Sequence, residues 1–225
     1  MKSSFWVKVS AILWKDVLTE FRTRDTFTSV LVFSILVIVI FNFTFDPGSQ
    51  MFETVAPGVL WVTFTFAGVL SLNRSFARDK EKGCLDGLVL CPADRVALYL
   101  GKMLSCLAFM LVVEAIVLPV FAVLFDLPLY LPKLAVIAVV ATIGFAAVGT
   151  VFSALVVHTR ARELLLPLLF FPIIIPVIIA AVKASELALS AASWSEMTSW
   201  LTIIAAFDVI FTVAAALVFD YVLEE

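Results

Sequence analysis

The chain has 225 residues, of which 63% are apolar and only 15% are charged. Soluble domains average about 45–50% apolar and about 25% charged residues, so this composition excludes an ordinary water-soluble enzyme or binding module. The formal net charge of −3 also gives no basic excess for binding nucleic acid. The composition therefore predicts an integral membrane protein.

Residues 3–24 are predicted to form an amphipathic helix that precedes the first membrane span. Apolar residues recur there at helical spacing, while Lys8, Lys15 and Arg22 follow one another every seven residues on another face. Such an interfacial helix lies along the membrane surface, with its bases near anionic lipid head groups. The pattern leaves open whether the helix is an anchor only or also contacts a partner.

Six later segments are long and apolar enough to cross a bilayer, which takes roughly 20 helical residues. Backbone groups in lipid must pair within their own segment, so we expect an all-α protein with six transmembrane helices. The expected spans, in a single transmembrane domain over residues 1–225, are 26–45, 55–72, 103–125, 134–157, 164–182 and 200–219.

The basic residues predict the orientation of these spans, because cytoplasmic loops retain Lys and Arg. Thirteen of the 15 basic residues lie before the first span or in the stretches between spans two and three and between spans four and five. Only Lys133 and Lys183 lie on the other side. We therefore expect both termini in the cytoplasm.

Two predicted spans contain an acidic residue, Glu114 in the third and Asp208 in the sixth. Charge inside a bilayer costs at least about 2.5–3.5 kcal/mol, so each carboxyl group needs a role. A hydrogen-bonded contact between helices and a proton relay are both open.

The fourth and fifth spans contain residues that affect helix packing. Ala146, Gly149 and Ser153 form a stripe of small residues in the fourth span, which allows close packing within the chain or across a dimer. The fifth span contains three prolines, which favour kinks. The Ala- and Ser-rich stretch 183–199 that follows predicts a separate interfacial helix.

The stretch 73–102 is the longest predicted cytoplasmic segment. A charged run is followed by a turn at Gly83, a short apolar patch over Leu85–Leu90 and a break at Pro92. Thirty residues are too few for an independent core, so an apolar patch beside charge indicates a docking surface for another protein. The alternative is that Leu85–Leu90 returns to the bilayer interface.

The sequence contains no motif of a self-sufficient enzyme. Neither the phosphate-binding pattern GxxxxGK[ST] nor HExxH occurs, His158 is the single histidine, and the three cysteines form no CxxC pair. We therefore predict a non-catalytic chain with no catalytic, metal or directly bound cofactor site.

Several motifs carry a family resemblance. Glu81–Leu88, followed by Pro92 and Leu100–Lys102, resembles the ATPase-contacting loop of ABC-2-type export permeases. The motifs Ala56–Val62, Leu72–Phe76 and Thr159–Glu163, together with the proline-rich fifth span, are similar to the heme exporter protein B (CcmB) family of the cytochrome c maturation system.

The resemblance implies a permease subunit in the bacterial inner membrane, present with a second copy of itself and with a separate CcmA-like ATPase subunit. It also implies CcmC-like and CcmD-like membrane partners and a CcmE-like heme chaperone. ATP would be hydrolysed by the partner, and heme would be handled by the complex. Hydrolysis would be coupled to heme delivery or to release of the heme-loaded chaperone.

The same resemblance, together with the charge pattern, predicts which residues contact the ATPase: Arg78, Asp79, Lys80, Glu81, Lys82, Gly83, Cys84, Leu85, Asp86, Leu88, Leu90 and Pro92. Two other functions remain open. One is an ABC-2-type permease that exports a different substrate. The other is a proton-coupled secondary transporter that uses Glu114 and Asp208.

Overall fold

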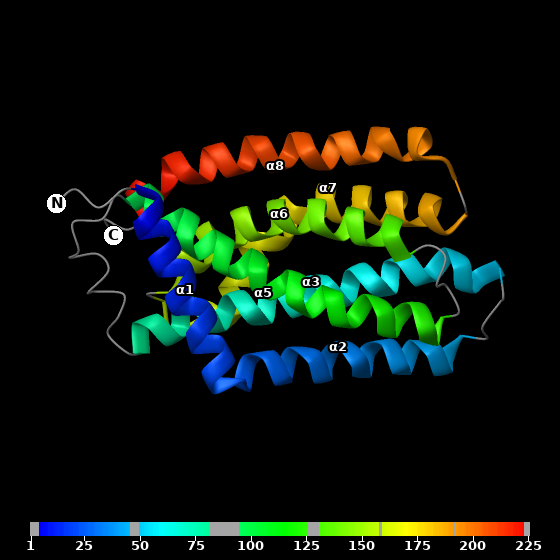
Figure 1. The fold of residues 1–225 in the computed structure, drawn as a ribbon, viewed down its shortest axis with the longest axis horizontal. Coiled ribbons are helices and arrows are strands. Elements are labelled where there is room, and N and C mark those ends of the chain that lie inside the picture. Colours follow the sequence, from blue (N-terminus) through cyan, green and yellow to red (C-terminus); the bar gives the residue numbers. More distant parts are fainter. Residues whose placement is uncertain are drawn as a thin grey trace.

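The computed structural model describes residues 5–45, 50–81, 95–125, 131–157, 159–190 and 192–222. In these ranges the chain forms α-helices and no β-strand (Figure 1). The helices are α1 (Phe5–Thr23), α2 (Asp25–Thr44), α3 (Gln50–Glu81), α5 (Arg95–Leu124), α6 (Leu131–Val156), α7 (Arg162–Leu189) and α8 (Trp194–Val222). The prediction of an all-α protein is confirmed.

Six of these helices, all except α1, are long and apolar enough to cross a membrane, as the sequence predicts. They run along the long axis of the molecule, while α1 crosses one end of the bundle (Figure 1). The C-terminal end of α8 lies at that same end. The first and last described helices therefore meet on one side of the bundle, as six successive spans require.

Several helices extend beyond the predicted spans. α3 continues through the charged run to Glu81 and α5 begins at Arg95, so both ends of the predicted loop 73–102 are helical. Residues 82–94 lie outside the described residues. The prediction of a separate interfacial helix within 183–199 is wrong, because α7 continues to Leu189 and α8 begins at Trp194. α7 passes through its three prolines as one helix.

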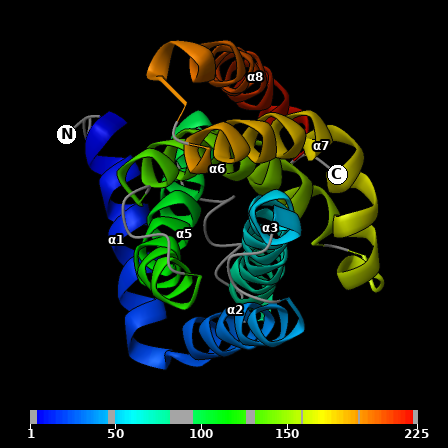
Figure 2. The ribbon, with the colours of Figure 1, turned by 90° about the vertical axis from the view of Figure 1, so that its right-hand side faces the viewer.

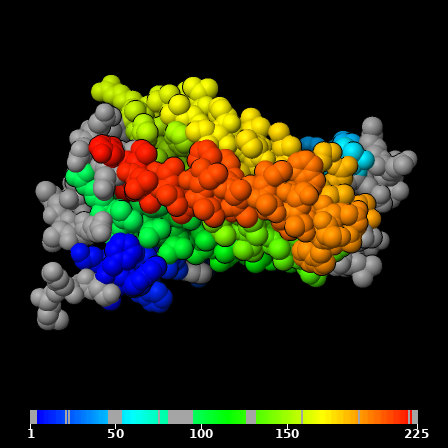
Figure 3. Space-filling view, turned by 90° about the horizontal axis from the view of Figure 1, so that it is seen from above, coloured from blue at the N-terminus to red at the C-terminus, as the bar shows by residue number. Residues whose placement is uncertain are grey.

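α6 lies inside the bundle and packs against α3, α5, α7 and α8 (Figure 2). A Cβ atom on Gly149 would overlap the Leu72 side chain of α3, and the Ser153 hydroxyl donates a 2.8 Å hydrogen bond to the Leu72 carbonyl. The stripe of small residues therefore packs within the chain. α8 lies along the outside of the bundle, with most of its residues exposed (Figure 3).

α1 presents two different apolar faces. Val9 and Ile12 are buried, and Ile12 packs directly against Gly101 of α5. On other positions of the same helix, Trp6, Trp14 and Leu18 are exposed. The predicted amphipathic helix is therefore present, and it is attached to the bundle through one face while the other remains free for the membrane interface.

Candidate functional site

Six charged side chains from three helices meet at the end of the bundle that α1 crosses. We call them the α1 charge cluster; its members are Lys15, Asp16 and Glu20 of α1, Arg78 and Asp79 of α3, and Lys102 of α5. α3 ends and α5 begins on the two sides of residues 82–94. The cluster therefore connects α1 to both helices that flank this segment.

Lys102 is the most buried member of the α1 charge cluster, with only 1% of its side chain exposed. Its Nζ atom lies 2.9 Å from Asp16 Oδ2 and also bonds to Asp79 Oδ2. Lys15 Nζ lies 3.0 Å from Asp16 and 3.2 Å from Asp79. Each carboxylate thus contacts two ammonium groups, which offsets much of the cost of removing four charges from water.

The pKa of the Lys15 ammonium reflects its attraction to the neighbouring carboxylates of the cluster. Burial alone lowers the pKa of the Lys15 ammonium, but the neighbouring Asp16 and Asp79 carboxylates outweigh burial and raise that pKa above its ordinary value. Lys15 therefore stays charged at neutral pH, and the link between α1 and α3 persists.

A second ion pair fixes the corner between α1 and α2. The Arg78 guanidinium lies 2.8 Å from Glu20 Oε2 and donates a 2.6 Å hydrogen bond to the Thr26 hydroxyl. The other Glu20 oxygen accepts the Phe27 backbone N–H at 3.2 Å, which satisfies one free donor at the start of α2. Glu20 therefore joins α1, α2 and α3.

The structure places three of the predicted ATPase-contacting side chains. Arg78 and Asp79 point toward α1 and are paired within the chain. Lys80 is exposed and donates a 3.1 Å hydrogen bond to the Val157 carbonyl, at the end of α6. α3 ends at Glu81, and the remaining predicted positions, 82–92, lie outside the described residues, as does His158.

The sequence analysis did not single out three members of the α1 charge cluster, Asp16, Glu20 and Lys102. Asp16 and Glu20 stand four residues apart, a spacing that places both on one face of a helix. Lys102 is the single base between Val96 and Met103, immediately before the long apolar run of its helix. Both features can be read from the sequence, but neither shows which other helix these side chains contact.

Both acidic residues of the predicted spans face α6. The Thr142 hydroxyl donates a 2.5 Å hydrogen bond to Glu114 Oε1, which joins α5 to α6. The Asp208 carboxyl of α8 lies against Gly144, where a Cβ atom would overlap it. One oxygen of each carboxyl group has no hydrogen-bond partner within the described chain. Within the described residues, Glu114 and Asp208 therefore contact α6 at different positions, Thr142 and Gly144.

Comparison with known proteins gives a consistent result. The model of the CcmB protein family matches residues 7–224. A heme exporter protein B of Pseudomonas aeruginosa is 32% identical over 193 residues, which cover 85% of this chain and 86% of the relative. The heme exporter protein B of Rhodobacter capsulatus is 33% identical over 171 residues, covering 75% and 78% of the two chains.

A third relative, the heme exporter protein B of Paracoccus denitrificans, is 32% identical over 181 residues, or 78% of this chain and 81% of the relative. The matches thus extend over most of both chains, through the spans as well as the α1 end of the bundle. By this agreement the chain belongs to the CcmB protein family.

Proposed function

We propose that this chain is the non-catalytic transmembrane subunit of an ATP-driven complex that handles heme for cytochrome c maturation. The observation that carries the mechanism is the α1 charge cluster, which holds α1 to both helices flanking residues 82–94. A separate, CcmA-like ATPase subunit would dock on that segment. The names of the relatives supply heme as the molecule handled.

The arrangement of the helices supports docking at this end of the bundle. α1, the last turn of α3, the first turn of α5 and the C-terminal end of α8 lie together there (Figure 1). The distribution of Lys and Arg predicts that this side faces the cytoplasm, where ATP is available. Both termini would then be cytoplasmic, in the inner membrane of a bacterium.

The ion pairs suggest how motion passes from the ATPase into the membrane. A displacement of residues 82–94 acts on α3 next to Asp79 and on α5 a few residues before Lys102. Because Lys15 and Asp16 bind these two side chains, α1 moves with them. The three helices would shift as a unit, and α5 would carry the shift toward the far side of the bilayer.

In this mechanism the chain transmits force and holds no cofactor of its own. Heme would be bound by CcmC-like and CcmD-like membrane partners, and the ATPase stroke would release a heme-loaded CcmE-like chaperone. A second copy of this chain would pair with the second ATPase subunit, as the ABC-2 resemblance implies.

Charge reversal at Lys82 tests the docking site. We expect Lys82→Glu to weaken binding of the ATPase subunit about tenfold, since it reverses the charge of a residue predicted to contact that subunit. Lys183→Glu is the matched control, because Lys183 is an exposed lysine near the opposite end of the bundle. The measurement is the amount of ATPase that co-purifies with the tagged chain, together with ATP hydrolysis. Equal recovery with both variants would contradict docking at 82–94.

Arg78 needs a different design because it already has a partner in the chain. Arg78→Glu would break the Glu20 pair, so weaker ATPase binding could arise through displacement of α1. The double variant Glu20→Arg/Arg78→Glu restores an ion pair of reversed polarity. We expect it to recover most of the ATPase binding; binding as weak as that of Arg78→Glu alone would contradict an effect that acts through the Glu20 pair.

A substitution at Glu114 distinguishes this mechanism from proton-coupled transport. We expect Glu114→Gln to leave formation of c-type cytochromes within about twofold of the wild type, since the amide oxygen still accepts the Thr142 hydrogen bond. The measurement is heme-stained cytochrome in membranes of cells that carry each variant. A loss of more than tenfold, with normal amounts of the folded chain, would favour a proton relay over a helix contact.

A further inference from the structure

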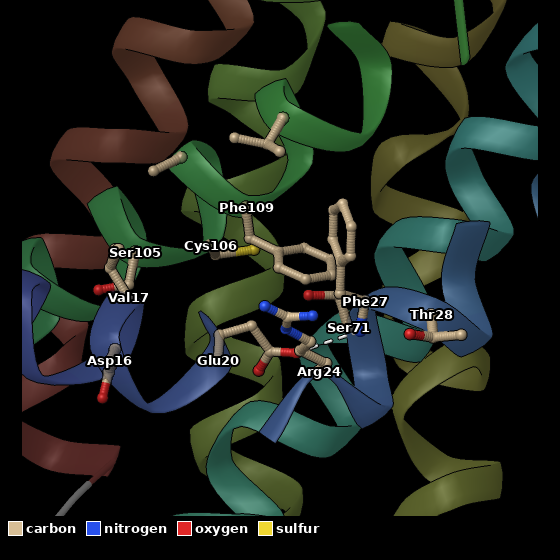
Figure 4. Close-up of a pocket in the computed structure, with 12 residues that line it drawn as sticks. Asp16, Val17, Glu20, Arg24, Phe27, Thr28, Ser71, Ser105, Cys106 and Phe109 are labelled. Carbon is tan, nitrogen blue, oxygen red and sulfur yellow. Dashed lines mark hydrogen bonds between the residues drawn. The ribbon is translucent and has the colours of Figure 1, made fainter. Parts of the chain in front are cut away.

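A cleft of about 410 Å³ lies between α1, the start of α2, α3 and α5. Its volume is within the range of roughly 300–1,000 Å³ that small-molecule sites occupy. Charged groups of α1 and Arg24 line one end (Figure 4). Phe27, Phe109 and Val112 line the apolar part. The cleft therefore has the polarity of an amphiphile, with a charged end and an apolar end.

The position of the cleft connects it to the bilayer. Val112 is 40% exposed and lies in the apolar part of α5, the helix that spans the membrane from Arg95 to Leu124. α1, which lines the cleft through Asp16 and Glu20, exposes Trp6 and Trp14 elsewhere along its length, and tryptophan prefers the interface between water and lipid. The cleft thus reaches from the level of the head groups toward the level of the acyl chains.

The charges of the lining leave one cation without an acidic partner. Asp16 is paired with Lys102 at 2.9 Å, and Glu20 is paired with Arg78 at 2.8 Å. Arg24 forms no ion pair within the described part of the chain, and its exposed side chain lines the cleft (Figure 4). An anionic ligand would complement this residual positive charge.

The backbone at Arg24 is also unusual. Arg24 has a φ of 58°, the left-handed conformation, and is the one non-glycine residue with positive φ among the described residues. Glycine adopts this conformation readily, whereas other residues pay of order 1 kcal/mol or more. Strained residues of this kind concentrate at binding sites, and here the strain brings a guanidinium to the charged end of the cleft.

We propose that the cleft binds one anionic phospholipid, with its phosphate on Arg24 and an acyl chain along Phe27, Phe109 and Val112. The bound lipid would fill the space beneath α1 next to the α1 charge cluster. It would therefore help to hold α1 at the angle that the ion pairs define. This lipid site does not depend on the proposed ATPase docking, and its test requires no ATPase.

The test is native mass spectrometry of the purified full-length chain, with any subunits that co-purify, titrated with dioleoylphosphatidylglycerol. We expect one tightly held molecule and about tenfold weaker binding of dioleoylphosphatidylcholine, whose head group is neutral overall. Arg24→Gly should weaken phosphatidylglycerol binding about tenfold, because glycine lacks the guanidinium but still adopts the positive φ. Arg24→Lys, which keeps the charge, should retain most of the binding.

Two variants serve as controls, Arg22→Gln for the charge at Arg24 and Ala115→Phe for a substitution that fills the cleft. Arg22→Gln changes an exposed base of α1 that does not line the cleft, so binding should change less than about twofold. Ala108→Phe fills the cleft and should abolish tight binding, whereas Ala115→Phe, on an exposed position of the same helix, should not. Thermal midpoints measured in parallel identify any variant that is unfolded.

Three results would overturn the lipid site. The first is equal binding of the two phospholipids by the wild-type chain. The second is unchanged phosphatidylglycerol binding by both Arg24→Gly and Ala108→Phe. The third is displacement of the lipid by inorganic phosphate at millimolar concentration, which would show a simple anion site without a contribution from the acyl chain.

Discussion

Lys102→Met should be one of the most destabilising single substitutions in this chain. The methionine side chain fills similar space, but Asp16 and Asp79 would then share the single ammonium of Lys15 in a largely buried site. Removing one partner of a buried ion pair costs roughly 3–5 kcal/mol. For a chain of this length, we expect the thermal midpoint in detergent to fall by roughly 6–20 °C.

The control for Lys102→Met is Lys183→Met, which removes a lysine from an exposed pair with Glu186. Exposed pairs contribute at most about 1 kcal/mol, so the midpoint should change by only a few degrees. The double variant Lys102→Met/Asp79→Asn removes one charge of each sign, and it should recover more than half of the loss. Similar midpoints for Lys102→Met and Lys183→Met would contradict the central position assigned to Lys102.

Gly101→Ala should separate α1 from α5. A Cβ atom at Gly101 would lie 2.8 Å from both Cβ and Cγ2 of Ile12. Rotation of the Ile12 side chain cannot relieve this overlap, because its Cβ is fixed to the backbone of α1. The helix itself must shift, and we expect a loss of roughly 1–3 kcal/mol, as in other overpacked cores. Faster proteolysis within α1 and a lower thermal midpoint would measure the change.

Gly58→Ala provides the matched comparison. Gly58 lies inside α3, and a Cβ atom there would have no neighbour within 4 Å. Alanine favours a helix over glycine by up to about 1 kcal/mol, so this variant should be as stable as the wild type or more stable. The two Gly→Ala substitutions, both within helices, would thus change the stability of the chain in opposite directions. A loss of stability only at Gly58 would be incompatible with the packing described.

The six spans could be predicted from hydropathy because lipid imposes one simple requirement on all of them. Each segment must be apolar, long and internally hydrogen-bonded, and these properties are local in the sequence. The ends of the helices were harder to predict from the sequence. α3 continues to Glu81 because a helix that leaves the bilayer can keep its hydrogen bonds when its side chains are charged, so hydropathy alone ends it too early.

The pairing of the charges could not be predicted from the sequence. Arg78 and Asp79 occur in a charged run that indicates contact with another protein, yet their partners in the structure are Glu20, Lys15 and Lys102. The sequence separation between Lys15 and Asp79 is 64 residues. No local pattern specifies such a pair, since it depends on how three helices pack at one end of the bundle.

The α1 charge cluster also constrains the order in which the molecule can be assembled. Among the described helices α1 is synthesised first, but Arg78 lies 58 residues after Glu20, and Lys102 comes later still. Until α3 and α5 have entered the membrane, Asp16 and Glu20 must remain hydrated at its surface. Closure of the cluster is therefore a late step in biogenesis, and α1 can reach its final position only after the first three spans are in place.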